Sequence, residues 1–118
     1  MSQNASLDEM LETADERRIN GDYEAAIAVY KEVLEIHGDC AAARHGLGLA
    51  LVYTGMFDEG LEELKKAVEL EPEQAKYELD LGKTYMMLGM FDEGKASMTR
   101  VLELDPENDE ARKQLSYF

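Results

Sequence analysis

Apolar side chains in the middle of the chain follow the spacing of two helices separated by a tight turn. Leu47 and Leu51 are four residues apart, as on one face of a helix, and Gly55 then interrupts the pattern. The helical spacing resumes at five apolar residues, Leu61, Leu64, Ala67, Val68 and Leu70. Pro72 ends it, because proline disfavours helical geometry in the residue before it. The pattern predicts a helical hairpin that begins near residue 41 and ends near residue 70.

This hairpin pattern recurs along the chain. The six residues from Gly55 to Gly60 return as Gly89 to Gly94, an offset of 34 residues, and residues 69–73 return as 103–107 with the same offset. A weaker copy precedes them, since Gly21 lies 34 residues before Gly55. Three repeats are therefore predicted, over residues 7–40, 41–74 and 75–108.

Two helices are expected in each repeat, and one more after the third. We expect helices near 7–20, 24–37, 41–54, 58–70, 75–88, 92–104 and 109–117. Ser6 and Glu9 have the spacing of a capping box at the start of the first helix. Residues 109–118 are expected to cover the exposed end of the third repeat, with Ala111, Leu115 and Phe118 facing inward. The chain is thus predicted to be all-α, with a single domain over residues 1–118.

Several residue types recur at fixed places in the repeats. Each first helix has a small residue, each turn a glycine two places before an aromatic residue, and each second helix a small residue followed by a bulky one; a proline closes two of the repeats. The matching residues are Ala14, Gly48 and Gly82; Gly21, Tyr23, Gly55, Phe57, Gly89 and Phe91; Ala26, Gly60 and Gly94; Tyr30, Leu64 and Met98; Pro72 and Pro106. In these features the chain resembles the tetratricopeptide repeat (TPR) family. The resemblance implies an α-solenoid of three helix-turn-helix repeats with a C-terminal capping helix.

The chain departs from the family's pattern at a few positions. Charged residues, Arg44, Glu78 and Arg112, stand where the family often has a large apolar residue. Gly60 and Gly94 replace the commoner alanine, which lowers helix propensity by about 1 kcal/mol each. We expect these departures to change local packing rather than the fold.

The resemblance also implies a binding surface, because in this family the first helix of each repeat lines a concave groove. The groove residues expected to contact a partner are Leu11, Arg18, Ile19, His45, Leu49, Val52, Tyr53, Leu79, Lys83, Met86 and Met87. Most of them are large and apolar, and a contiguous exposed apolar patch usually marks a binding site. The hypothesis is a groove that takes an apolar or amphipathic peptide or helix of a partner protein.

Two other interpretations of these residues stay open. Val52, Met86 and Met87 could pack mainly between neighbouring helices, which would leave a shallow, hydrated groove. Alternatively, the groove could be filled by the chain's own end, where Phe118 is apolar, or by a second copy of the protein.

One specialised site of the family is not expected here. Some members hold the C-terminal carboxylates of heat-shock chaperones with a Lys/Asn/Asn/Lys/Arg clamp. The corresponding positions are Leu11, Asp15, Gly46, Lys76 and Asp80, of which Lys76 alone matches. Two of the replacements are carboxylates, which would repel an anionic ligand end.

Charge narrows the range of partners. The chain has 12 Lys and Arg against 26 Asp and Glu, a net charge of −14. Such a field repels phosphate and anionic lipid, so neither nucleic acid nor a membrane is expected as a partner. Basic partners would instead be attracted. The chain has no apolar run of membrane-spanning length, and its single cysteine, Cys40, cannot form an internal disulfide; the cytoplasm is the predicted compartment.

Catalytic and metal chemistry is poorly supported. His37, Cys40 and His45 lie close together in sequence, but three ligand types on one short stretch, with no second cluster, are a weak zinc signal. Cys40 as a nucleophile would need a positioned base and oxyanion donors, and no glycine-rich loop follows it. We therefore expect no metal, no cofactor and no catalytic residue, and the protein is not predicted to be an enzyme.

The function that the sequence favours is a non-catalytic protein–protein interaction module, an adaptor, scaffold or chaperone-like protein that binds a basic or amphipathic segment. The alternative is a structural role in which the repeat faces or the C-terminal helix assemble the protein into a homo-oligomer.

Overall fold

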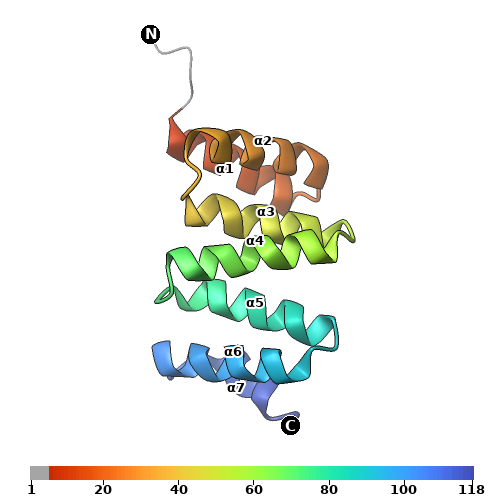
Figure 1. Cartoon of the computed structure of the whole chain (residues 1–118), viewed down its shortest axis with the longest axis vertical. Helices are drawn as coiled ribbons and strands as arrows, with labels where there is room; N and C mark the ends of the chain where they lie inside the picture. Colours follow the sequence, from red (N-terminus) through yellow and green to blue (C-terminus); the bar gives the residue numbers. More distant parts are fainter. Residues whose placement is uncertain (1–5) are drawn as a thin grey trace. The chain divides into compact units, whose positions relative to one another are not determined.

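The computed structural model describes residues 6–118 and contains seven α-helices and no strand in that range (Figure 1). The helices are α1 (Leu7–Ile19), α2 (Tyr23–Ile36), α3 (Ala41–Tyr53), α4 (Phe57–Leu70), α5 (Ala75–Met87), α6 (Phe91–Leu104) and α7 (Asp109–Leu115). Their bounds agree with the expected ones to within two residues. The predicted fold class, an α-solenoid of three helix-turn-helix repeats followed by a capping helix, is confirmed.

Glycine makes the turn inside each hairpin. Gly21, Gly55 and Gly89 have φ values of +86°, +87° and +79°, in the left-handed region that side chains with a Cβ disfavour. In the second hairpin the amide of Gly55 donates to the carbonyl of Val52, and the amide of Met56 donates to that of Leu51 at 2.9 Å. This pair of bonds is a Schellman motif, which satisfies the last carbonyls of the helix while the chain reverses.

Side-chain caps mark the start of two helices. The Ser6 hydroxyl accepts from the Glu9 amide at 3.1 Å, and the Glu9 carboxylate accepts from the Ser6 amide at 3.0 Å, so the predicted capping box is present. These bonds hold the pKa of Glu9 below its usual value. At the start of α7, Asn108 Oδ1 accepts from the Ala111 amide at 2.9 Å.

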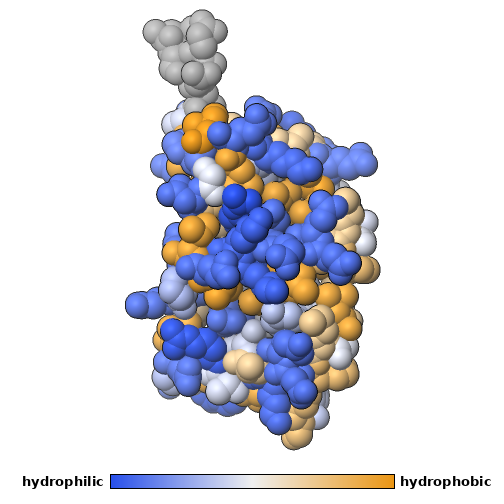
Figure 2. All heavy atoms as spheres, viewed as in Figure 1, coloured by the Kyte–Doolittle hydropathy of each residue, from blue (hydrophilic) through white to orange (hydrophobic). Residues whose placement is uncertain are grey.

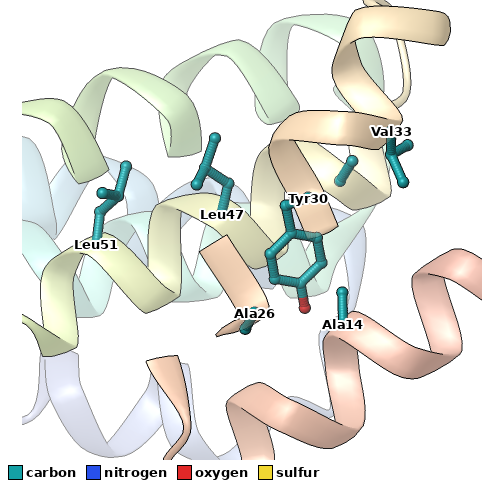
Figure 3. Packing of buried hydrophobic residues seen from close by; sticks show 7 residues of the cluster. Ala14, Ala26, Tyr30, Val33, Leu47 and Leu51 are labelled. Atoms are coloured by element: carbon teal, nitrogen blue, oxygen red, sulfur yellow. The ribbon is translucent and has the colours of Figure 1, made fainter. Parts of the chain in front are cut away.

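The helices group into two compact parts, one ending at Leu70 and the other beginning at Glu71. In the first part, α1 packs on α2 and α3, and α3 also packs on α2 and α4. Figure 3 shows the centre of its core, where Tyr30 lies among small and aliphatic side chains from α1, α2 and α3. The buried residues of this core are Ala14, Ala26, Tyr30, Val33, Ala43, Leu47 and Leu51.

Two glycines explain the close packing of α3 on α4. A Cβ built on Gly48 would lie 2.7 Å from Leu64 Cγ, and one on Gly60 would lie 2.7 Å from Val52 Cγ2 and 2.8 Å from the Gly48 carbonyl oxygen. The two backbones therefore meet face to face. The loss in helix propensity at Gly60 accompanies a contact that alanine would prevent.

The second part contains α5, α6 and α7. Met98, Val101 and Ala111 form its buried core, with Leu79, Met86, Leu102 and Leu115 packed around them. Gly94 again allows close packing, since a Cβ there would lie 2.9 Å from Met86 Sδ.

Two of the three residues expected to face inward from the C-terminal segment do so. Ala111 is fully buried and Leu115 is half-buried, as predicted. The inward orientation predicted for Phe118 is wrong, because its side chain is 53% exposed. The reason is that α7 ends at Leu115, so Phe118 does not continue the inward face of the helix.

Candidate functional site

The first helix, α1, joins the core of the first part through a polar cluster around Tyr30. The Tyr30 hydroxyl accepts a hydrogen bond from Arg18 Nε at 3.0 Å and donates one to Asp15 Oδ1. Arg18 Nη2 also lies 3.6 Å from Asp15 Oδ1. In Figure 3 the hydroxyl of Tyr30 points toward the helix that carries Ala14. The predicted groove residue Arg18 and the clamp-position residue Asp15 are thus held in place by a buried tyrosine of α2.

The surroundings of Tyr30 and Arg18 favour their ordinary protonation states, a neutral phenol and a charged guanidinium. Burial raises the pKa of Tyr30, and the hydrogen bond to Asp15 raises it further. Burial opposes the charge of Arg18, but its hydrogen bond to Tyr30 and its attraction to Asp15 outweigh that effect and raise its pKa. At neutral pH the cluster is therefore a neutral phenol between a cation and a carboxylate.

The third helix presents some of its predicted groove residues and buries others. His45 and Val52 are buried, with 6% and 5% of their surfaces exposed, whereas Leu49 is half-buried. Tyr53 is 59% exposed at the end of α3, and its ring lies 5.5 Å from that of Tyr23, centroid to centroid. Gly46 contacts the core rather than solvent, because a Cβ there would lie 2.2 Å from Tyr30 Cζ.

The predicted groove residues on α1 differ in how far they are exposed to solvent. Leu11 and Arg18 are half-buried, and Ile19, the last residue of the helix, is 74% exposed. In the first part α1 packs on α3, so the helices that carry these two sets of residues are neighbours. The accessible residues among them are Leu11, Arg18, Ile19, Leu49 and Tyr53.

The fifth helix carries the four predicted residues of the second part. Leu79 and Met86 are half-buried beside the Met98 cluster, and Met87 is 55% exposed. Lys83 Nζ lies 2.9 Å from Glu110 Oε2 on α7, an ion pair that joins the capping helix to α5. The accessible apolar surface of α5 is therefore concentrated at its end.

Residues outside the predicted set form an apolar pocket together with one predicted residue, Met86. It has a volume of about 280 Å³ and is lined by Met86, Phe91, Gln114, Tyr117 and Phe118. The rings of Phe91 and Phe118 meet edge-on at 6.1 Å, and Lys95 Nζ lies 5.4 Å from the centre of the Phe118 ring. The 34-residue recurrence of an aromatic residue after each turn glycine was the signal that could have included Phe91.

The candidate metal residues are not arranged as a site. His37 is exposed, Cys40 is a half-buried free thiol and His45 is buried. Within residues 6–118 no group of three or more His, Cys, Asp or Glu side chains is placed to hold a metal ion. None of the helices in the described part of the chain combines the length and the apolar character needed to cross a membrane.

The fold and its turn geometry agree with a known sequence family. A family profile described as "Tetratricopeptide repeat" matches residues 18–78 and 51–116. The chain belongs to the tetratricopeptide repeat family. No significant match is found among curated proteins.

Solved TPR structures superpose on nearly the whole chain. A Thermobaculum terrenum O-GlcNAc transferase mutant is 30% identical with a TM-score of 0.88; the match covers 99% of this chain but only 23% of the transferase chain. The first TPR of Spaghetti (RPAP3), bound to the HSP90 peptide SRMEEVD, is 23% identical with a TM-score of 0.88 and covers 94% and 88% of the two chains. The second TPR domain of human RPAP3, in complex with the HSP70 peptide SGPTIEEVD, is 24% identical with a TM-score of 0.83 and covers 92% and 90%. The last two likenesses show a shared fold.

Two of the charged departures from the TPR pattern have the same structural role. Arg44 Nη2 donates to the Gly38 carbonyl at 2.9 Å, and Arg112 Nη2 donates to the Pro106 carbonyl at 2.7 Å, in each case six residues back in the preceding loop. Arg44 Nη1 also pairs with Glu63 at 2.9 Å. These arginines tie each incoming helix to the loop before it, where the family often uses an apolar contact.

Proposed function

We propose that residues 1–118 act as one non-catalytic protein-interaction module, which binds an amphipathic segment of a partner protein on the faces of its first helices. The observation that carries the proposal is that each first helix ends in an exposed apolar side chain. These residues are Ile19 of α1, Tyr53 of α3 and Met87 of α5. Such side chains gain by being covered, since burying apolar surface contributes roughly 25 cal/mol per Å².

Half-buried residues extend this surface in each part of the molecule. Leu11 and Leu49 add apolar area to the face formed by α1 and α3, and Leu79 and Met86 add it on α5. His45 and Val52 are buried, so we assign them to the support of that face rather than to ligand contact. Methionine and tyrosine suit such a surface, because methionine adapts its shape and tyrosine combines a large apolar ring with a polar end.

The charge of the protein favours a basic ligand. With a net charge of −14, the chain would attract a segment rich in Lys or Arg and speed its encounter, and added salt would weaken that attraction. The same charge disfavours nucleic acid and anionic membranes as ligands, and the cytoplasm remains the compartment predicted from the sequence.

Acidic chaperone tails, the ligands in the two RPAP3 structures, do not suit this surface. At the clamp positions Asp15 is engaged by Arg18 and Tyr30, and Lys76 Nζ lies 3.5 Å from the buried Asp80 carboxylate. An incoming carboxylate would therefore meet the Asp15 carboxylate in the first part, and in the second part a lysine that already has a carboxylate partner. We expect no measurable binding of the peptide SRMEEVD to this chain, which a fluorescence titration would check.

The proposal is tested by placing charge on the first-helix faces. The double variant Leu49→Glu plus Met86→Glu should abolish the capture of partner proteins from a lysate, as identified by mass spectrometry, while circular dichroism shows unchanged helical content. Because both residues are half-buried, a second variant, Ile19→Glu plus Met87→Glu, tests the same faces at well-exposed positions. Ile36→Glu is the matched control, since Ile36 is 66% exposed on a second helix. Capture that persists in both double variants would contradict the proposal.

Self-association is the alternative, and the exposed C-terminal aromatic residues favour it. Tyr117 and Phe118 are well exposed beside the pocket that they share with Met86 and Phe91. If two copies associate there, Phe118→Ser should abolish a concentration-dependent increase in sedimentation coefficient. A protein that stays monomeric at high concentration would remove this alternative.

A further inference from the structure

Each hairpin turn of this protein carries an exposed apolar pair. The last residue of the first helix and the first residue of the second helix are apolar or aromatic in all three repeats: Ile19 and Tyr23, Tyr53 and Phe57, Met87 and Phe91. All of them except Tyr23, which is half-buried, are more than 40% exposed. The recurrence at one structural position, outside the core, indicates a surface rather than scattered exposed residues.

In the first part of the molecule two of these turns join into one patch, the turn edge, formed by Ile19, Tyr23, Tyr53, Met56 and Phe57. The contact between the rings of Tyr23 and Tyr53 connects the first hairpin to the second. Met56 and Phe57, 46% and 41% exposed, follow directly in the turn that begins at Tyr53. Figure 2 shows mostly hydrophilic side chains over the middle of this part and apolar ones at its margins, including the side where the α3–α4 turn lies.

Carboxylates flank the turn edge. The second helices begin with Tyr23 followed by Glu24, and with Phe57 followed by Asp58 and Glu59, and all three acids are exposed. The basic residues at the end of α1 are engaged: Arg17 Nη1 lies 3.6 Å from Asp22 Oδ2, and Arg18 is held by Tyr30 and Asp15. The patch thus combines aromatic and aliphatic groups with an excess of negative charge.

This charge decides between the candidate occupants. Two copies of the chain meeting at their turn edges would bring like charges together, which is unfavourable. Anionic lipid is repelled for the same reason. We propose that the turn edge binds a segment of another protein in which apolar side chains alternate with Lys or Arg, so that the apolar groups cover the aromatic residues and the cations pair with Glu24, Asp58 and Glu59. The inference rests on the protein-interaction role proposed above, places the contact at the turn edge and specifies the ligand.

The probe for this proposal is a labelled amphipathic peptide of leucine and lysine at helical spacing, compared with the same peptide carrying glutamate in place of lysine. Fluorescence anisotropy should show binding of the lysine peptide and none of the glutamate peptide. The variant Met56→Ser plus Phe57→Ser should weaken binding about tenfold, the effect of roughly 1.4 kcal/mol. Ile36→Ser, which removes a more exposed apolar side chain at the opposite end of α2, should leave the affinity within about twofold of the wild type.

A second pair of variants tests the carboxylates with the net charge held equal. Asp58→Asn plus Glu59→Gln should weaken binding and reduce its dependence on salt. Glu35→Gln plus Glu69→Gln removes the same charge from the last turns of α2 and α4, about 18 Å along these helices from the turn edge, and should have a smaller effect. Equal effects of the two charge variants would overturn the pairing with the turn edge and leave only the general field of the protein.

The turn edge and the first-helix faces can fail separately. Neither Met56 nor Phe57 belongs to a first helix, so wild-type affinity in Met56→Ser plus Phe57→Ser would overturn the turn-edge proposal whatever Leu49→Glu does. Loss of peptide binding in that variant but not in Leu49→Glu would support the turn edge and contradict the first-helix face of the first part as the site. Circular dichroism of each variant confirms that its helices are intact.

Discussion

At the scale of single residues, Tyr30 organises the first part of the molecule. Its ring fills the space beside Gly46 of α3, and its hydroxyl bonds to Asp15 and Arg18 of α1. One side chain of α2 therefore sets both the packing of α3 and the orientation of polar groups on α1. A buried hydroxyl with both partners present stabilises the core, whereas removal of the hydroxyl would take one hydrogen bond from each of Asp15 and Arg18.

Gly46→Ala tests the packing of this tyrosine. The new Cβ would lie 2.2 Å from Tyr30 Cζ, so the ring or the helix must shift, and we expect a loss of about 1–3 kcal/mol in the free energy of unfolding. Gly38→Ala is the control, because its Cβ would meet a single atom, the Leu34 carbonyl oxygen, at an ordinary 3.6 Å. Denaturant titration of both variants makes the comparison. If the Gly46→Ala protein were as stable as the Gly38→Ala protein, the Tyr30 ring could move aside for the added methyl group at little cost.

Tyr30 also predicts a dependence of stability on pH. Burial raises its pKa above the ordinary value of 10.0, so the folded state holds the proton more tightly than the unfolded state. This contribution is complete below pH 10 and is lost as the pH rises through the folded pKa, because the unfolded state then releases a proton that the folded state keeps. The stability advantage of the wild type over Tyr30→Phe should therefore shrink as the pH rises above 10. Thermal melts of both proteins over a pH series measure it, and an advantage that grows with alkaline pH would contradict the assignment.

At the scale of elements, the turns and caps explain where the helices begin and end. The glycine turns and the proline-marked loops lie in the same repeat positions that the sequence predicted, and the helix bounds follow them closely. The final helix is the shortest of the helices described. It has only seven residues, so its stability depends on its cap and on the burial of Ala111 more than on its own length.

Asn108→Ala tests how far α7 relies on its cap. The Asn108 side chain accepts from the Ala111 amide, and we expect its removal to lower the free energy of unfolding by about 1 kcal/mol. Gln74→Ala is the matched control, because Gln74 occupies the same position before α5 but its side chain makes no capping bond. Hydrogen exchange of the α7 amides, measured with urea denaturation, should show faster exchange in the first variant alone. Equal behaviour of the two variants would assign the stability of α7 to packing.

At the scale of the whole molecule, net charge is the dominant feature. A chain of 118 residues with a net charge of −14 carries self-repulsion that the compact state must overcome. The ion pairs on its surface are local, and exposed pairs of this kind typically contribute less than about 1 kcal/mol each. The charge that attracts a basic ligand therefore also limits stability at low salt.

The melting temperature should accordingly rise as sodium chloride is raised from roughly 10 mM to 150 mM, where the Debye length falls from about 30 Å to about 8 Å. Over the same range the affinity for the leucine and lysine peptide should fall, since screening weakens attraction between the protein and the peptide. Differential scanning fluorimetry and anisotropy, run in the same buffers, measure the two effects. A melting temperature that decreases with salt would show that local ion pairs outweigh the net repulsion.

The fold was predictable from local patterns, whereas the accessibility of the proposed binding residues was only partly so. The 34-residue recurrence and the turn glycines identify the hairpins, because helix spacing and left-handed turns depend on nearby residues. The exposure of Ile19, Tyr53 and Met87 follows from their place at helix ends. The burial of His45 and Val52 does not, since their positions on α3 appear equivalent to those of accessible neighbours until the packing of the helices is known.

Local chemistry was thus enough to specify seven helices, their turns and a negatively charged surface, since each of these depends on residue type and short-range spacing. Packing between helices determined the rest: that Gly46 accommodates the Tyr30 ring, that Gly48 and Gly60 bring two backbones together, and that Phe118 lies against Phe91 instead of facing the core. The physical reason is that burial is a property of neighbours brought together by folding. A residue's type shows that it can be buried, but only its surroundings determine whether it is.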